Sequence, residues 1–198
     1  HGVSPDGRHY FPVFPYTSYT RMTDDDLRDL RTYIFSLPPV DRPSIPHDVK
    51  FPFGWRFLLG AWKWLNFEPG SYLPEPDQSA QWNRGAYLVR ALAHCGECHS
   101  RRNSMGAVVE SEFLAGTEDG PEGETTPNLT PHATGLAEWD EGDIMFMLQT
   151  GITPEGDVVG SLMSEVVKEN TSKLSNEDVA AIASYLTSLT PVDNPLKR

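Results

Sequence analysis

The chain has 198 residues, of which 38% are hydrophobic, and this composition fits one or two soluble domains. Its 17 prolines and 16 glycines indicate extensive loops. The formal net charge of −12 disfavours nucleic acid and anionic membranes as partners. It favours a partner with a basic patch, although charge kept for solubility alone is an equal alternative. No apolar run reaches the length of a membrane span.

The first part of the chain contains segments that recur near its end. Three segments recur, 149 positions later for the first and 152 for the others: residues 2–7 as 151–156, 23–27 as 175–179, and 33–40 as 185–192. This repetition predicts that residues 1–44 are the C-terminal half of one domain and residues 79–192 its complete second copy. Residues 45–78 would then be a linker and 193–198 a tail. The alternative is that residues 1–44 form a degenerate arm packed on a single domain.

Each copy ends in a predicted amphipathic helix. Thr23 with Asp26, and Ser175 with Asp178, resemble capping boxes at which a helix begins. Apolar residues follow these caps at helical spacing: Leu27, Leu30, Ile34 and Leu37, then Val179, Ile182, Ala183, Leu186 and Leu189. A proline stands shortly after each run, where helices usually end.

The linker is rich in proline and has a Trp/Phe-rich stretch over residues 51–67. Its apolar residues at helical spacing predict a stripe along one helix: Trp55, Leu58, Leu59 and Trp62. This stretch is too short to cross a bilayer. We expect the helix to fill a groove between two domains, the alternative being docking to a partner subunit or to a membrane surface.

A further helix is predicted over residues 82–94, directly before the chain's two cysteines. Gly85 weakens such a helix, because glycine loses more backbone entropy than other residues on folding. The glycine therefore indicates that another helix crosses closely at this point. We predict that the crossing helix is the one over residues 179–189, the alternative being a surface glycine of no consequence.

The run Cys95–Gly96–Glu97–Cys98–His99 carries the strongest functional signal. Two cysteines three residues apart on a helical turn project the same way, so both sulfurs can reach the vinyl groups along one porphyrin edge. A Cys-x-x-Cys-His run is typical of covalent haem attachment, with His99 as the proximal iron ligand. A structural zinc site needs about four Cys or His ligands, which the chain does not supply in a second cluster. A thioredoxin-type pair would need a βαβ setting, and a simple disulfide is the remaining alternative.

The sixth iron ligand distinguishes electron transfer from catalysis, because a Met/His pair closes the iron to substrates. Met163 is the best candidate: it lies 64 residues after His99, in a loop before the last helix, so the chain can pass around the haem edge. His132 in a proline-rich loop, or an open site, are the alternatives. Four other residues are too close to His99 or fit a core-filling role better: His94, Met105, Met145 and Met147.

The repeat also bears on a first haem. By the first offset Met163 aligns with Phe14, which cannot bind iron, and Met22 is the only methionine of the first copy. If a first haem exists, we predict Met22 as its ligand. The alternative is that Met22 is a core residue beside a helix.

These residues resemble a known family: the dihaem and multihaem cytochrome c subunits that accompany periplasmic alcohol, gluconate and aldehyde dehydrogenases of bacteria. The resemblance covers nearly the whole chain and rests on these segments: Trp82–Val89, His94–His99, Pro127–Pro131, Gly135–Trp139 and Met163–Lys173, with Gly2–Gly7 and Phe14–Tyr16 matching a preceding haem domain. It implies an all-α fold with a class I cytochrome c domain. It supports Cys95, Cys98, His99 and Met163 as haem-holding residues, and it implies that the loop at 127–131 supports the ligand histidine.

The resemblance also implies what the chain does. We expect an electron-transfer protein, not an enzyme, with one covalent haem c and a second if a preceding half-domain exists. It would relay single electrons from a periplasmic dehydrogenase to a downstream cytochrome, oxidase or quinone, with peripheral membrane association open. The alternatives are a haem enzyme, a peroxidase or sulfur-compound oxidase with an open or weakly ligated haem, and a docking subunit with a vestigial haem.

Overall fold

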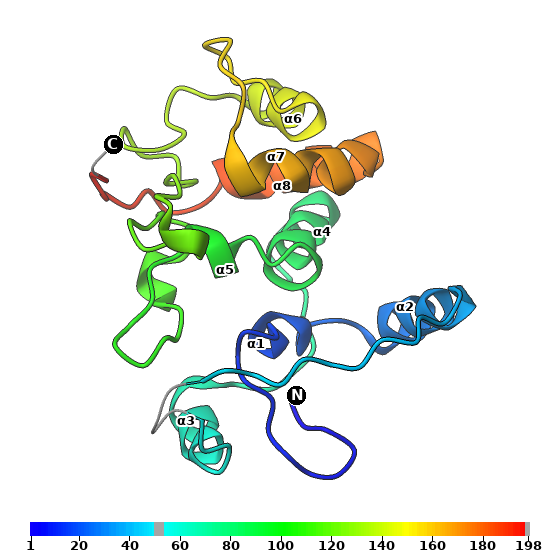
Figure 1. Ribbon diagram of the computed structural model, residues 1–198. Coiled ribbons are helices and arrows are strands. Elements are labelled where there is room, and N and C mark those ends of the chain that lie inside the picture. Colours follow the sequence, from blue (N-terminus) through cyan, green and yellow to red (C-terminus); the bar gives the residue numbers. More distant parts are fainter. Residues whose placement is uncertain (50–53, 197–198) are drawn as a thin grey trace. The chain divides into compact units, whose positions relative to one another are not determined.

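The computed structural model describes residues 1–49 and 54–196 and forms two compact units, His1–Tyr72 and Leu73–Arg198 (Figure 1). The regular structure of both units is helical. Within the described ranges there is no strand or sheet, and extended backbone pairs only as isolated antiparallel bridges. The predicted all-α fold class is therefore confirmed. The predicted boundaries near residues 44 and 78 stay predictions.

Unit 1, His1–Tyr72, is built around a helix from the predicted linker. It contains three helices: α1 (Tyr16–Tyr19), α2 (Asp24–Ser36) and α3 (Leu58–Asn66). The Nζ of Lys63 on α3 donates to the carbonyls of His1 and Gly2, at 2.7 and 2.6 Å. The same ammonium lies 4.5 Å from the ring centroid of Tyr16, which is buried. α3 thus packs on the N-terminal segment. The start of the predicted aromatic stretch, Phe51 to Phe53, lies outside the described residues.

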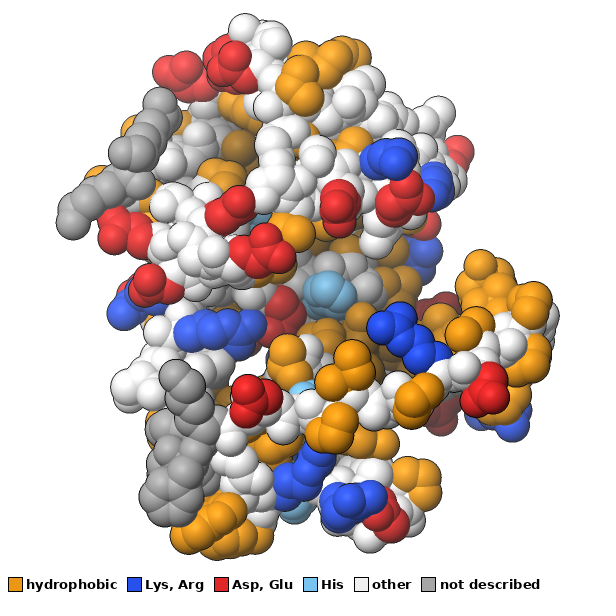
Figure 2. All heavy atoms as spheres, in the orientation of Figure 1, with side chains coloured by type: hydrophobic (Ala, Val, Ile, Leu, Met, Phe, Trp, Pro, Cys, Tyr) orange, Lys and Arg blue, Asp and Glu red, His pale blue; other side chains and the backbone are white. Residues whose placement is uncertain are grey.

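α2 forms as predicted but buries none of its residues. Its N-terminus is capped by Thr23, whose Oγ1 accepts from the Asp26 N–H at 3.1 Å. Its apolar residues are all at least 43% exposed: Leu27, Leu30, Tyr33, Ile34 and Phe35. Figure 2 shows hydrophobic side chains gathered over this helix. Within the described part of unit 1, no element covers this apolar face.

Unit 2, Leu73–Arg198, holds the predicted haem-attachment motif. Its longer elements follow in this order: α4 (Ala80–Tyr87), the π-helical turn η1 (Leu88–Leu92), α5 (Gly96–His99), α6 (Glu141–Thr150), α7 (Ser161–Glu169) and α8 (Asn176–Thr187). Three short 3₁₀ turns complete the unit: η2 (Glu110–Glu112), η3 (Pro121–Gly123) and η4 (Thr171–Lys173). The helix predicted over residues 82–94 begins earlier, at Ala80, and widens into η1 before the cysteines.

The crossing of α4 and α8 confirms the interpretation of Gly85, and the two helices lie side by side in Figure 1. A Cβ atom at Gly85 would stand 1.9 Å from the carbonyl oxygen of Ala181 and 2.8 Å from the Cβ of Tyr185. Only glycine allows this approach. An Arg84–Asp178 pair adds two hydrogen bonds across the same interface, at 2.7 and 2.9 Å. This hydrogen bonding by Arg84 lowers the pKa of Asp178.

Three small hairpins share one backbone pattern, at residues 2–10, 101–109 and 151–159. Each is closed by an antiparallel bridge between its second and eighth residues. In each, the N–H of the ninth residue donates to the carbonyl of the first, at 2.8 to 2.9 Å. The first and third hairpins belong to the sequence repeat. The second follows the attachment motif, and the sequence analysis did not find it because it shares little beyond a glycine at its sixth position.

The close approach at Gly85 makes a prediction about stability. Replacing Gly85 by Ala places a methyl group against the Ala181 backbone, which cannot yield without separating the helices. We expect a loss of about 3 kcal/mol or more in the free energy of unfolding, measured by urea titration. The control is Gly160→Ala in the same unit, where an added Cβ meets nothing within 4 Å. Equal stability of the two variants would contradict the close crossing.

Candidate functional site

The two cysteines and His99 lie on one helical turn. Cys95 caps α5, and its carbonyl accepts from the N–H groups of Cys98 and His99, at 3.2 and 2.9 Å. Both thiols are free, so the disulfide alternative is not formed. Burial raises the pKa of Cys95 to about 12, and burial together with the neighbouring Glu97 raises the pKa of Cys98. At neutral pH both side chains are therefore thiols, the form that resists oxidation to a disulfide.

His99 is oriented by a single backbone acceptor. Its ring is buried, and its Nδ1 lies 3.0 Å from the carbonyl oxygen of Pro127. A carbonyl only accepts, so Nδ1 carries the proton and the lone pair of Nε2 is left for a metal. Burial lowers the pKa of His99, against a smaller raising effect of the Pro127 bond, and keeps the imidazole neutral. This arrangement fits an iron ligand.

The segment after the motif holds its backbone in place. The N–H of Gly116 donates to the carbonyl of His99 at 2.8 Å, and Oγ1 of Thr126 donates to that of Cys98 at 2.7 Å. The ring of Phe113 lies against Gly96, where an added Cβ would be 2.2 Å from its Cε2. The residue directly after Cys95 must therefore be small, which the sequence analysis did not recognise.

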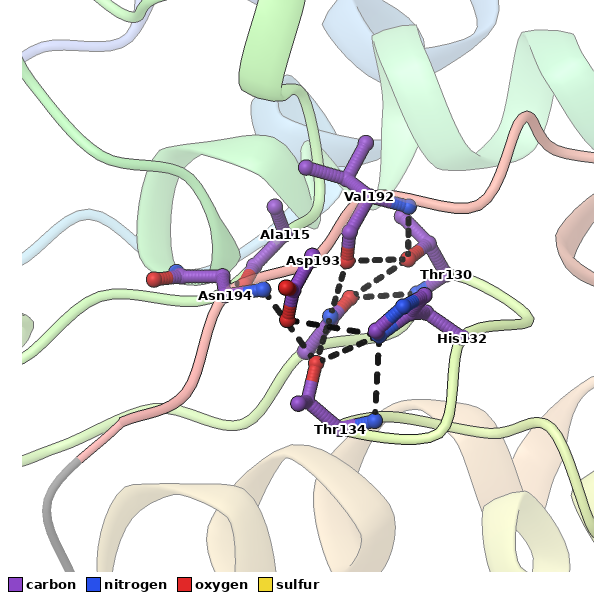
Figure 3. A network of polar contacts seen from close by, with 8 residues as sticks. Ala115, Thr130, His132, Thr134, Val192, Asp193 and Asn194 are labelled. Carbon is purple, nitrogen blue, oxygen red and sulfur yellow. Dashed lines mark hydrogen bonds and ion pairs between the residues drawn. The ribbon is translucent and has the colours of Figure 1, made fainter.

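The loop that holds His99 is fixed by Asn128, whose partners Thr130, Thr134 and Val192 are labelled in Figure 3. The Asn128 amide is 1% exposed, and its Nδ2 donates to the carbonyl of Val192 at 2.8 Å and to Oγ1 of Thr134 at 3.0 Å. Its Oδ1 accepts from both the N–H and the hydroxyl of Thr130, at 2.8 and 2.7 Å. The segment after α8 is thereby tied to the loop at 127–131. The predicted support of the histidine by this loop agrees with the geometry.

Met163 lies in unit 2, but not in the loop expected for it. It lies in the first turn of α7, which is followed by η4 and then by α8, and its side chain is partly exposed. The expectation of a loop was wrong. Val166 and Val167 have a weak helix propensity, but Val167 is buried and its packing holds the segment as a helix. The structure thus brings Cys95, Cys98 and His99 together on one turn and sets Met163 on a separate element of the same unit.

Met22 lies in unit 1, in the turn between α1 and α2. Its side chain is 5% exposed, and its N–H donates to the carbonyl of Tyr19 at 3.1 Å. This position is compatible with both alternatives raised by the sequence, a ligand in a first haem domain or a core residue beside a helix.

His132, the alternative sixth ligand, belongs to the polar network of Figure 3. Its Nδ1 accepts from the N–H of Thr134 at 3.2 Å and contacts the hydroxyl of the same residue at 3.0 Å. A neutral His132 therefore carries its proton on Nε2, the nitrogen an iron would need. Among the described residues, no group of three or more His, Cys, Asp or Glu side chains is placed to hold a metal ion, which disfavours the zinc alternative.

Comparison with known proteins agrees with this site. No family model matches the chain. It is 47% identical to a dihaem cytochrome c-type protein of Cereibacter sphaeroides over 94% of this chain and 61% of that protein. It is 38% identical to the fructose dehydrogenase cytochrome subunit of Gluconobacter japonicus over 96% of this chain and 39% of that protein. The chain is a homologue of these bacterial cytochromes c.

A further relative extends the comparison beyond the family that the sequence analysis named. One of the subunits of the nicotinate dehydrogenase of Pseudomonas putida is 42% identical over 95% of this chain, which corresponds to 16% of that protein. This chain therefore spans 61% of the length of the first relative and less of the other two. The predicted resemblance to cytochrome c subunits of dehydrogenases is confirmed.

The role of Asn128 generates a test of the loop. Asn128→Ala removes the Nδ2 donor to the Val192 carbonyl and leaves the buried N–H of Thr130 without its Oδ1 acceptor, and we expect a loss of about 3 kcal/mol in unfolding free energy. Asn176→Ala is the control, since its side chain makes one hydrogen bond at an exposed position. The measurement is thermal unfolding of both variants. A cost for Asn128→Ala no larger than that of the control would show that the loop is held by other contacts.

Proposed function

We propose that this chain is a c-type cytochrome that binds one haem c through Cys95, Cys98 and His99 and relays single electrons. The observation that carries the proposal is the hydrogen bond from His99 Nδ1 to Pro127, at 3.0 Å within a Cys-x-x-Cys-His turn. This bond fixes the tautomer and the ring orientation that an iron ligand requires. A thiol-redox site has no need of it.

Each residue has a defined task in this proposal. The thiols of Cys95 and Cys98 would form the two covalent links, and Nε2 of His99 would bind the iron. The bound haem supplies one-electron iron chemistry. The loop at 127–131 keeps the imidazole from rotating through the Pro127 carbonyl. A site whose ligand geometry is fixed lowers the reorganisation energy of electron transfer.

Met163 is the sixth ligand in this proposal. A thioether raises the reduction potential and leaves no open position for a substrate, as an electron carrier requires. The hydrogen bond that Nδ1 of His132 accepts argues against His132. After Met163 the chain is tied back to α6, because the hydroxyl of Thr171 donates to the carbonyl of Leu148.

The partner in this proposal is a dehydrogenase. Three relatives carry the names of fructose, alcohol and gluconate dehydrogenase cytochrome subunits. A net charge of −12 favours a basic docking surface on the partner. Because covalent haem attachment normally takes place outside the cytoplasm, we place the protein in the periplasm. No described residues form a helix long and apolar enough to cross a membrane.

Substitution of Met163 tests the ligand and separates the carrier from a haem enzyme. The chain is produced with a haem-attachment system, and its intact mass is expected to increase by one haem. Met163→Leu should abolish the near-infrared methionine–iron band and let the reduced protein bind carbon monoxide. Met105→Leu, on the exposed hairpin, is the matched control and should change neither. A wild-type protein that already binds carbon monoxide readily would favour the peroxidase or oxidase alternative.

We extend the proposal to residues 1–44 as the C-terminal half of a preceding haem domain, with Met22 as its iron ligand. By the repeat, α2 corresponds to α8, and Leu30 corresponds to Ile182. Ile182 is 3% exposed in the packed copy, whereas Leu30 is 44% exposed. A helix equivalent to α4, in a preceding segment, would bury the uncovered face of α2.

This extension is tested in the natural polypeptide that contains residues 1–198. We expect more than one haem per chain by mass. Leu30→Asp should lower the midpoint of thermal unfolding of the first haem domain by several degrees, because it puts a charge on the buried face. Phe35→Asp, which corresponds to the partly exposed Thr187, should have a much smaller effect. A single haem per chain, or equal effects of the two variants, would refute the half-domain.

A further inference from the structure

A partly buried arginine lies beside the attachment motif. Arg90 is on η1, five residues before Cys95, and its side chain is 27% exposed. Its Nε donates to the hydroxyl of Tyr185 on α8 at 2.8 Å, and its guanidinium carbon lies 4.0 Å from the ring centroid of Phe113. Its Nη1 also donates to a carboxylate oxygen of Glu110 at 3.3 Å. Side chains from two other segments, α8 and residues 110–113, therefore meet at this one cation.

Little compensates the charge of Arg90. Glu110 is its only ion-pair partner among the described residues, and that carboxylate is 63% exposed and at the long end of hydrogen-bond distance. Tyr185 is 2% exposed, and burial raises its pKa, so the phenol is neutral. Burial opposes the charge of Arg90, but its contacts with Tyr185 and Glu110 raise its pKa above the ordinary value. The guanidinium is thus a permanent positive charge whose one carboxylate partner among the described residues is exposed to solvent.

The guanidinium acts on the motif through an aromatic ring. Phe113 lies under the cation and at the same time contacts Gly96 between the two cysteines. The N–H of Cys95 donates to the carbonyl of Val89 at 3.0 Å, which ties the motif to the turn that carries Arg90. The guanidinium of Arg90 thus packs on the ring of Phe113, and that ring packs on the backbone of the proposed haem-attachment turn at Gly96.

We infer that Arg90 is a positioning and potential-setting residue for the haem: it holds Phe113 on Gly96 and places a fixed positive charge beside the Cys-x-x-Cys turn. The inference rests on the proposed haem attachment. A positive charge repels the ferric centre more strongly than the ferrous one, which carries one positive charge less, so it favours the reduced form. A partly buried charge is screened less by salt than a surface charge.

The tests use the haem-loaded chain and measure its reduction potential against a fixed reference couple. Arg90→Met keeps much of the length and removes the charge. We expect it to lower the equilibrium constant for reduction by up to about tenfold, equivalent to about 59 mV for a one-electron couple. The shift should persist at high salt. Arg90→Lys keeps the charge but loses the planar fork of donors, so it should retain most of the potential while losing stability.

Arg84→Met is the matched control, because Arg84 lies on the preceding helix, its side chain is 45% exposed against 27% for Arg90, and it is ion-paired with Asp178. It should cost some stability and leave the potential nearly unchanged. If Arg90→Met and Arg84→Met shift the potential equally, or if Arg90→Lys shifts it as much as Arg90→Met, Arg90 has a structural role only and the inference is wrong. If the wild-type chain binds no haem and shows no reversible one-electron couple, the proposed function itself fails.

Discussion

The contact between Gly85 and the backbone of Ala181 is the constraint on which unit 2 depends. It brings α4 and α8 together, and each helix then leads into one half of the site. α4 continues through η1 into the cysteines, while the chain after α8 reaches Val192, whose carbonyl accepts from Asn128. Asn128 in turn fixes the loop that orients His99. A side chain at residue 85 would therefore disturb both halves together.

The Cys-x-x-Cys-His turn, the proposed site of haem attachment, is held mainly by backbone groups. Carbonyls of Cys98, His99 and Pro127 all have specific partners, and the thiols and Nε2 are the atoms left for a cofactor. Such a framework suits the proposed role, since it does not depend on the charge of a bound iron. Arg90 differs from these backbone contacts, because it brings a formal charge to the motif, as the Glu97–Arg102 ion pair also does.

Local signals were enough to predict the attachment motif, the capped helices and the crossing at Gly85, because each depends on spacing or on one residue's conformational cost. The contacts of Phe113 with Gly96, and of Arg90 with Tyr185, were not predictable, since no periodic pattern in the sequence links these residues. The helical setting of Met163 was missed because burial of Val167 outweighs the weak helix propensity of its neighbours. The sites of Met163 and Met22 as ligands remain predictions.

The three hairpins share one more property, at their tips. Gly7, Gly106 and Gly156 all have positive φ, and an added atom at each would meet nothing within 4 Å. Chain inserted beside such a tip need not disturb either packed unit. The hairpin at 101–109 also follows directly on the cysteine turn. It therefore offers an attachment point for wiring the protein to an electrode, with the tether anchored only a few residues from the proposed redox centre.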